Sequence, residues 1–184
     1  NPLLQTVDLV RLKELCLKYN IILVIDATFA TPYNLDLKPY ADIYIESLTK
    51  FACGNADVLM GAIILNENSK ISMMSQEFFI FLEEPYIKDI QRLAFQIKDF
   101  EKRMKVISQN TKLLVEYFQT APFINEIFYC LNPKYASNYQ KLMIDENSYT
   151  GIVSVTFKKD FKEVYDKLNF AKGPSLGTEF TLLM

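Results

Sequence analysis

The chain has 184 residues, half of which are apolar, and its formal net charge at pH 7 is −2. That apolar fraction is enough for a buried core, whereas the charge offers no basic face for nucleic acid. The absence of histidine excludes histidine-based catalytic triads and most zinc sites, so no metal site is expected. No apolar run reaches the length of a membrane span, and the 3 widely spaced cysteines suit reduced thiols. We therefore expect a cytoplasmic protein with no membrane or nucleic-acid partner.

The first part of the chain is predicted to alternate between strand and helix. Asp8 can cap a helix that runs to about Tyr19. The branched apolar run 21–25 then predicts a strand buried on both faces of a parallel sheet. Further strands are predicted at 42–46 and 58–65. This order of elements is typical of an α/β fold.

The middle of the chain is predicted to be mostly helical. Residues 71–84 carry an apolar patch that favours a helix, either buried or in contact with a second subunit. After Pro85, apolar residues at spacings of three and four predict one long helix to about Gln119. Asp99 and Arg103 have the spacing of a surface ion pair on this helix, worth roughly a few tenths of a kcal/mol.

The last part of the chain predicts shorter elements. Alternating patterns favour strands at 123–129 and 151–157, with a short helix between them over about 132–143. Asp160 can cap a final helix that runs to about Leu168. This order suits a small α/β domain with helices on one face of an antiparallel or mixed sheet.

A candidate site combines Asp26 with the run Ser47-Leu48-Thr49-Lys50. Asp26 ends the first strand, and catalytic groups in open α/β sheets collect at the carboxyl ends of strands. If the backbone is extended here, the hydroxyls of Ser47 and Thr49 share one face and can hold a phosphate. Lys50 can then form an imine with an aldehyde, while Asp26 keeps a pyridine nitrogen protonated. Each residue alone is common in turns, caps and solvated surfaces, and only the combination points to pyridoxal phosphate.

This combination belongs to a longer resemblance. The chain resembles the Cys/Met-metabolism family of pyridoxal-phosphate enzymes, which includes cystathionine β-lyase, cystathionine γ-synthase and γ-lyase, methionine γ-lyase and the homoserine sulfhydrylases. The resemblance implies the fold-type-I architecture of PLP-dependent transferases, of which this chain would be about the C-terminal half. The blocks that carry it are 1–3, 24–32, 41–43, 47–51 and 54–59, and more weakly 103–104, 122–124 and 175–177.

The same resemblance implies further site residues. Asn1 would hydrogen-bond the phenolic oxygen of the cofactor, and Thr28 would also contact the cofactor. Ser175 and Leu176 would help hold the substrate carboxylate through backbone groups. The chain also departs from the family, because Ala27 stands where relatives usually carry asparagine beside the aspartate. The arginine with which relatives clamp the carboxylate would lie beyond the last residue.

The resemblance implies two domains and one type of chemistry. Residues 1–105 would be the remainder of the large cofactor-binding domain, and residues 106–184 the start of a small α/β domain. The implied reaction is elimination or replacement on sulfur amino acids through a Lys50 imine. We expect a cystathionine β-lyase type first, with γ-lyase or homoserine sulfhydrylase as alternatives.

The expected partners include an amino-acid substrate. The chain would also associate with further copies of itself, as a dimer or tetramer, or with a missing N-terminal half that completes the site. Without such a half, the central sheet would have an exposed edge or face. Two other interpretations stay open at this point: a truncated relative that folds and self-associates without catalysis, and an unrelated α/β binding module.

Overall fold

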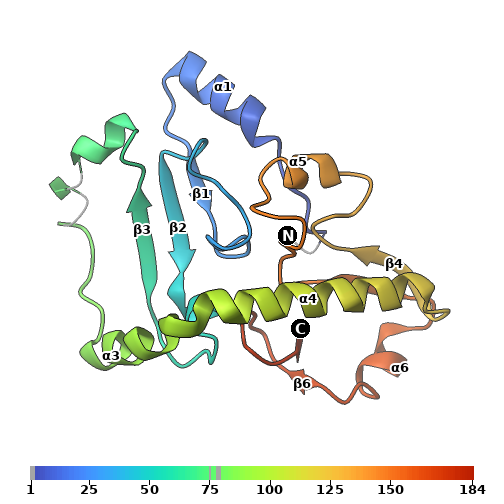
Figure 1. Cartoon of the computed structure of the whole chain (residues 1–184). Helices are drawn as coiled ribbons and strands as arrows, with labels where there is room; N and C mark the ends of the chain where they lie inside the picture. Colours follow the sequence, from blue (N-terminus) through green and yellow to red (C-terminus); the bar gives the residue numbers. More distant parts are fainter. Residues whose placement is uncertain (1–2, 75, 78–79) are drawn as a thin grey trace.

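The computed structural model describes residues 3–74, 76–77 and 80–184. Figure 1 shows a small central sheet and a long helix, α4 (Phe100–Thr120), that runs past one end of it. A second group of short elements lies toward the far end of this helix. The expected position of Asn1 falls outside the described residues.

The first helix, α1 (Leu9–Tyr19), forms as predicted because both of its ends are capped by local residues. The Asp8 carboxylate accepts a hydrogen bond from the Arg11 N–H at 3.1 Å. Asn20 ends the helix with a φ of 55°, a left-handed conformation that lets its N–H reach carbonyls of the last turn.

The central sheet contains β1 (Val24–Asp26), β2 (Ile43–Ser47) and β3 (Gly61–Leu65), in that spatial order. Strands β1 and β2 are parallel, whereas β3 pairs antiparallel with β2. The predicted α/β class is confirmed, and the sheet is mixed rather than wholly parallel. Within the described residues, β1 and β3 are both edge strands.

Part of one face of this sheet is open to solvent, although Ile43 on the same face is only 6% exposed. The pairing register places Val24, Ile45 and Ile63 on the same face, and their exposed fractions are 47%, 40% and 41%. The prediction that residues 21–25 are buried on both faces is therefore wrong, because Ile21, Ile22 and Val24 are about half exposed in the described structure. The expectation of an exposed edge or face is confirmed.

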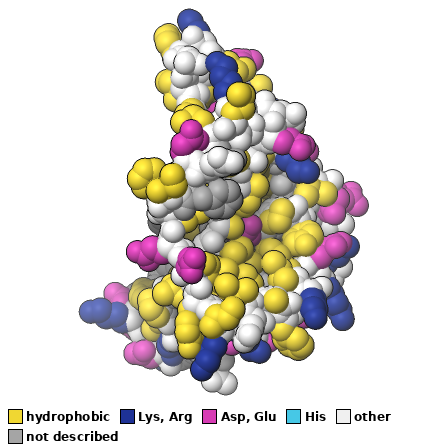
Figure 2. Space-filling model, turned by 90° about the vertical axis from the view of Figure 1, so that its left-hand side faces the viewer, with side chains coloured by type: hydrophobic (Ala, Val, Ile, Leu, Met, Phe, Trp, Pro, Cys, Tyr) yellow, Lys and Arg dark blue, Asp and Glu magenta, His cyan; other side chains and the backbone are white. Residues whose placement is uncertain are grey.

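A second exposed apolar surface lies over α3 (Ile87–Gln96). Its residues Ile87, Ile90 and Phe95 are all exposed. Figure 2, viewed from the side of β3 and α3, shows hydrophobic side chains gathered on this face of the molecule.

The long helix predicted for the middle of the chain is interrupted. α3 passes through one 3₁₀ turn, η3 (Ile97–Asp99), before α4 begins. The prediction of one continuous helix is wrong at this point because the Gln96 carbonyl accepts a hydrogen bond from the Arg103 side chain at 3.0 Å. No helix among the described residues is both long and apolar enough to cross a bilayer.

The segment 71–84 differs from its predicted helix. Its first residues form a short 3₁₀ helix, η2 (Lys70–Met74), residues 76 and 77 are helical as predicted, and residues 80 to 86 are turn and coil. Residues 75, 78 and 79 of the predicted helix lie outside the described residues.

The elements after α4 are short and form two small sheets. β4 and β5 are antiparallel, whereas β6 and β7 are parallel. The Asp160 carboxylate caps α6, as predicted, by accepting from the Lys162 N–H at 2.9 Å. The bounds are β4 (Ile124–Phe128), α5 (Ala136–Gln140), β5 (Ser154–Phe157), α6 (Phe161–Tyr165), β6 (Ala171–Lys172) and β7 (Leu182–Leu183).

Two buried clusters hold these elements together. The first joins α1 and the loop after β1 to residues around α5, and the second packs the segment after β2 against α3 and α4. Because the first cluster draws on both sides of residue 105, the division into domains at that residue stays a prediction. The first cluster contains Leu9, Ala27, Leu35, Leu37, Cys130, Tyr139 and Leu142. The second contains Phe51, Ala52, Cys53, Val58, Leu93, Phe100 and Met104.

Replacing Tyr139 with phenylalanine is expected to lower the free energy of unfolding by about 1–2 kcal/mol. The Tyr139 side chain is 2% exposed, and its hydroxyl donates to the Ser148 carbonyl at 2.7 Å. Tyr135→Phe is the matched control, because the Tyr135 hydroxyl bonds the Leu3 carbonyl at an exposed position. Urea unfolding should show less than about 0.5 kcal/mol for the control. Equal losses in the two variants would rule out burial as the cause.

Candidate functional site

The carboxyl ends of β1 and β2 lie next to each other, because the two strands are parallel neighbours. β1 ends at Asp26 and β2 ends at Ser47. Thr28 connects the two ends, since its hydroxyl oxygen accepts a hydrogen bond from the Ser47 N–H at 2.9 Å. One carboxylate oxygen of Asp26 accepts from the Thr28 N–H at 3.0 Å, and Asp26 is exposed. Three of the predicted cofactor-binding residues are thus neighbours at one edge of the sheet.

Lys50 lies in a tight turn after β2, residues 48–54, which we call the lysine turn. Its first part, η1 (Leu48–Ala52), is a π-helical turn closed by a hydrogen bond from the Cys53 N–H to the Leu48 carbonyl at 3.0 Å. Lys50 leaves helical geometry inside it, with φ −87° and ψ −123°, so the chain changes direction at the lysine. The assumption that the backbone is extended across the two hydroxyls is therefore wrong.

The two hydroxyls of the predicted phosphate cradle have different surroundings. The Thr49 hydroxyl accepts from the Met60 N–H at 3.2 Å and donates to the Met60 carbonyl at 3.4 Å. Thr49 thus fastens the segment before β3 to the lysine turn. The Ser47 hydroxyl makes no hydrogen bond to another described residue. Of the two, Ser47 is the one with a hydroxyl ready for a phosphate oxygen.

The fold brings Lys50 together with a residue 125 positions later in the chain. The Lys50 amine donates to the Ser175 hydroxyl at 3.0 Å. Leu176 is partly buried against the second cluster, so the segment that was predicted to bind the substrate is anchored beside the lysine. The position of this segment could not be read from local sequence.

Gly177 allows this close approach. Its φ is +82°, and an added Cβ would lie 2.6 Å from the Phe51 amide nitrogen and 2.8 Å from the Lys50 carbonyl carbon. Both contacts are to backbone, which cannot rotate away. Only glycine fits the position without moving one of the two segments.

Gly177→Ala is therefore expected to displace the segment that carries Ser175 and to break its hydrogen bond with Lys50. Amide hydrogen exchange should become about tenfold faster or more in residues 173–179, because a strained φ and a backbone clash cost of the order of 1–3 kcal/mol. Gly173→Ala is the control, since a Cβ there meets only Leu182 methyl carbons at 3.5 and 3.8 Å. Unchanged exchange in Gly177→Ala would show that the contact is not needed.

Arg103 has a larger role than the surface ion pair predicted for it. Its bond to Asp99, at 2.9 Å, is present, but the Arg103 side chain is only 11% exposed. Its guanidinium donates to the carbonyls of Phe51 at 2.7 Å and Ala52 at 2.8 Å, both in the lysine turn. The predicted ion pair is thus confirmed, but its description as a surface pair is wrong, because Arg103 is largely buried and also reaches carbonyls some fifty positions earlier.

Glu46 was missed by the sequence reasoning. It sits on β2 beside the motif and is only 7% exposed. Burial, together with the negative charge of Asp26, raises the pKa of the Glu46 carboxyl from 4.5 to about 7. The available signal was a charged residue inside an otherwise apolar strand.

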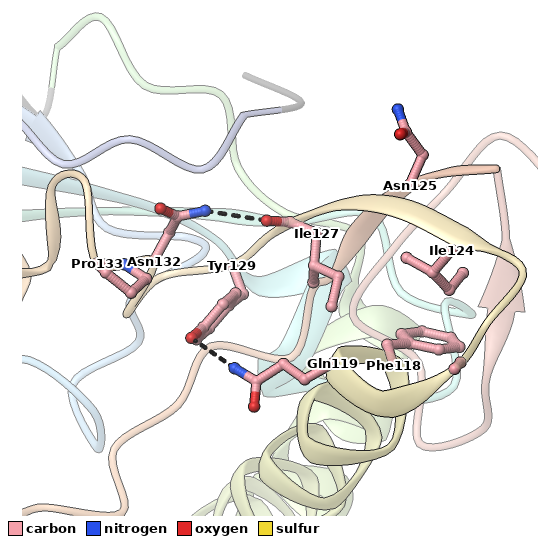
Figure 3. Close-up of a pocket in the computed structure, with 9 residues that line it drawn as sticks. Phe118, Gln119, Ile124, Asn125, Ile127, Tyr129, Asn132 and Pro133 are labelled. Atoms are coloured by element: carbon pink, nitrogen blue, oxygen red, sulfur yellow. Dashed lines mark hydrogen bonds between the residues drawn. The ribbon is translucent and has the colours of Figure 1, made fainter. Parts of the chain in front are cut away.

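Two hollows lie near these elements. One, of about 290 Å³, is at the far end of α4, where Figure 3 shows Gln119 facing the Tyr129 hydroxyl and Asn132 facing the Ile127 carbonyl. None of the predicted site residues that the structure describes lines it. The other, of about 350 Å³, is lined by Cys53 and Asn55 and so lies against the lysine turn.

The arrangement fits the groups of pyridoxal phosphate. An exposed carboxylate with one oxygen left unbonded by described residues lies at the carboxyl end of β1, and a hydroxyl that makes no hydrogen bond to another described residue lies at that of β2. The amine of Lys50 follows three residues after the end of β2. Among the described residues, no group of three or more acidic or cysteine side chains could hold a metal ion. The roles of Asp26, Thr28, Ser47, Thr49, Lys50, Ser175 and Leu176 remain predictions.

Comparison with known proteins places the chain among related sequences. Residues 1–183 match the family model described as Cys/Met metabolism PLP-dependent enzyme. The chain is 36% identical over 183 residues to the L-2-amino-4-chloropent-4-enoate dechlorinase/desaturase of Streptantibioticus cattleyicolor, covering 99% of this chain and 37% of that protein. It is 35% identical over 189 residues to the cystathionine gamma-synthase of Neurospora crassa, covering 99% of this chain and 30% of that protein.

Solved structures show the same fold. The metB protein of Corynebacterium glutamicum superimposes with a TM-score of 0.84 at 25% identity, over 97% of this chain and 47% of that chain. Apo CalE6, a methionine gamma lyase from Micromonospora echinospora, gives 0.81 at 24% identity, over 97% of this chain and 49% of that chain. The chain therefore spans about a third of the curated relatives and about half of these structures. The predicted fold-type-I architecture is confirmed.

Proposed function

This chain belongs to the Cys/Met metabolism family of PLP-dependent enzymes, and from that premise we propose that it binds pyridoxal phosphate at Lys50 and takes part in elimination or replacement on sulfur amino acids. The single observation that best supports the proposal is the 3.0 Å hydrogen bond between the Lys50 amine and the Ser175 hydroxyl. It joins the predicted cofactor lysine to the predicted substrate segment.

Each residue has a defined task in this proposal. When bound, the cofactor supplies an aldehyde that can link to an amine and a protonated ring that draws electrons from the substrate. Asp26 presents its exposed carboxylate to the ring nitrogen, and Ser47 donates its hydroxyl to the phosphate. The Lys50 amine takes and returns protons at the substrate carbon, and Ser175 fixes where that amine lies. Thr28 and Thr49 hold the backbone of the site together.

The curated relatives favour a reaction at the γ-carbon. The Neurospora crassa protein named above is a cystathionine gamma-synthase, and so is a Saccharomyces cerevisiae protein 34% identical to this chain over 198 residues. We therefore place γ-replacement ahead of the β-lyase reaction expected from sequence, and keep γ-lyase and homoserine sulfhydrylase activity as alternatives.

The test is a substrate panel. The complete gene product, supplied with pyridoxal phosphate, is incubated with an acylated homoserine plus cysteine, an acylated homoserine plus sulfide, cystathionine, or methionine. Formation of cystathionine from the first mixture is the expected result. Pyruvate and homocysteine from cystathionine would instead identify a β-lyase, and turnover of none of the four would reject the proposed reaction class.

A second candidate is a relative that folds and associates without catalysis. The open sheet face with Val24, Ile45 and Ile63 favours association, and the Thr49 hydroxyl already engaged by Met60 leaves fewer groups for a phosphate. The covering partner would be another copy of the chain or the rest of a longer protein. In this case the chain would acquire no cofactor at Lys50. We propose a cytoplasmic location for either candidate.

A further inference from the structure

We propose that Arg103 is a positioning residue that holds the lysine turn, and with it Lys50, in the geometry needed to link the cofactor. This inference rests on the proposed function of Lys50. The backbone of the lysine turn carries Lys50, so the amine can be held in place only as firmly as that backbone. The hydrogen bonds to the carbonyl groups of the turn therefore decide how well Lys50 is positioned.

Every carbonyl in η1 has a hydrogen-bond donor, and the donors fall into two groups. Three of the carbonyls are bonded from within the lysine turn. The last two are bonded by the Arg103 guanidinium. The donors and distances are Cys53 N–H to Leu48 at 3.0 Å, the Cys53 thiol to Thr49 at 2.9 Å, Gly54 N–H to Lys50 at 3.0 Å, and Arg103 to Phe51 at 2.7 Å and to Ala52 at 2.8 Å.

The chemistry of the guanidinium suits this task. It is planar and carries five donors in a fixed fork, so it can bond two successive carbonyls at once. The same group also bonds the Gln96 carbonyl at 3.0 Å and the Asp99 carboxylate at 2.9 Å, which fixes it to the break between α3 and α4. Arg103 thus connects the lysine turn to α3 and α4, whereas the other hydrogen bonds to carbonyls of η1 come from within the turn.

The end of the lysine turn packs closely against the Arg103 side chain and is also hydrogen-bonded to the segment that follows Ser175. Gly54 has a φ of +76°, and a Cβ there would lie 2.5 Å from a terminal nitrogen of Arg103. The Gly54 carbonyl accepts a hydrogen bond from the Glu179 N–H at 2.8 Å, two residues beyond Gly177. Loosening Arg103 would therefore reach both Lys50 and the segment that carries Ser175.

The three cysteines allow local opening of the lysine turn to be compared with opening elsewhere in the chain. Cys53 lies in the lysine turn, whereas Cys16 is on α1 and Cys130 is in the first cluster, and all three are buried free thiols. The hollow of about 350 Å³ against Cys53 gives a small reagent a path to that thiol once the turn opens. The rate of native-state alkylation at each cysteine, followed by peptide mass spectrometry, measures opening at three places in one sample.

The variants are Arg103→Met, which keeps the stem and removes every donor, and Arg103→Lys, which keeps the charge but not the fork. The control is Arg11→Met at an exposed position on α1. In Arg103→Met, alkylation of Cys53 is expected to rise about tenfold or more relative to Cys16 and Cys130, because two charged hydrogen bonds to the turn are lost. In Arg103→Lys, the alkylation rate of Cys53 should lie between the rates of Arg103→Met and the wild type.

Three results would overturn the proposal. They are equal acceleration at all three cysteines, no acceleration at Cys53, and failure of both Arg103 variants to fold. The first and third would make Arg103 a residue of general stability, and the second would show that the turn is held without it.

A second measurement separates this proposal from the proposed function. The complete gene product is mixed with pyridoxal phosphate, reduced with borohydride at intervals, and the fraction of Lys50 modified is followed. We expect modification about tenfold slower or more in Arg103→Met than in Arg11→Met, by the same loss of two hydrogen bonds. If the wild type acquires no cofactor, the proposed function fails, while the cysteine measurement still decides whether Arg103 holds the turn. Equal rates of modification would overturn the positioning role.

Discussion

Replacing Lys50 with alanine is expected to lower the turnover of whichever sulfur amino acid the complete protein accepts by about a thousandfold or more. Under the proposed function, the variant loses the amine that would link the cofactor and move the substrate proton, and no other described lysine is bonded to Ser175. Its stability should change little, by about 1 kcal/mol, because one partly buried hydrogen bond is removed. Steady-state kinetics with saturating cofactor, together with urea unfolding, measure both effects.

Two further variants test whether the loss of turnover is due to the Lys50 amine itself rather than to the loss of a positive charge or of any lysine. Lys50→Arg keeps a positive charge near Ser175 but cannot form the covalent link, and it should be as inactive as the alanine variant. Lys105→Ala removes a lysine whose side chain is 69% exposed and paired with Glu101, and it should keep wild-type turnover. Activity in Lys50→Arg above about a tenth of wild type would show that charge alone suffices.

Glu46→Gln is expected to stabilise the protein at pH 8 by about 3 kcal/mol and to have little effect at pH 5. The pKa of the buried Glu46 carboxyl is raised from 4.5 to about 7, first by burial and then by the charge of Asp26. The folded state therefore binds this proton more tightly than the unfolded state. The contribution of Glu46 to stability is most favourable below about pH 4.5, falls between pH 4.5 and 7, and reaches its full penalty above pH 7, where Glu46 must be charged.

The measurement is the difference in free energy of unfolding between variant and wild type, from urea titrations at both pH values. Taking the difference removes the contribution of other titrating groups. Glu126→Gln, at an exposed position on β4, is the control and should give a difference near zero throughout. If Glu46→Gln and wild type keep a constant difference from pH 5 to pH 8, the carboxyl does not titrate in this range.

The parts of the fold that the sequence predicted are those decided locally. The cap at Asp8, the left-handed Asn20 and the cap at Asp160 depend on neighbouring backbone groups, so their residue types are enough. Burial of the run 21–25 was predicted wrongly because it depends on a covering layer, which a strand's own residues do not reveal. The break between α3 and α4 was missed because a side chain, Arg103, competes for a helix carbonyl.

The residues of the candidate site also divide into those that local sequence predicted and those that only the fold brings together. The motif around Lys50 could be recognised because its residues are consecutive, and Asp26 could be added because it ends a strand. The partner Ser175 was predicted from family resemblance, and only the fold shows that its hydroxyl meets the lysine. Arg103 owes its role to contacts with a distant segment, which its spacing from Asp99 does not reveal. The burial of Glu46 is likewise decided by the fold, and a charged residue in an apolar strand was only a weak signal of it.

The most direct test of the central claim is to locate the cofactor on the chain. The complete gene product is incubated with pyridoxal phosphate, reduced with borohydride and digested, and the modified peptide is identified by mass spectrometry. We expect a single pyridoxyl group on Lys50, with exposed lysines such as Lys105 unmodified at stoichiometric cofactor. A label spread over surface lysines, or none on Lys50, would contradict the assignment of this amine as the cofactor's attachment point.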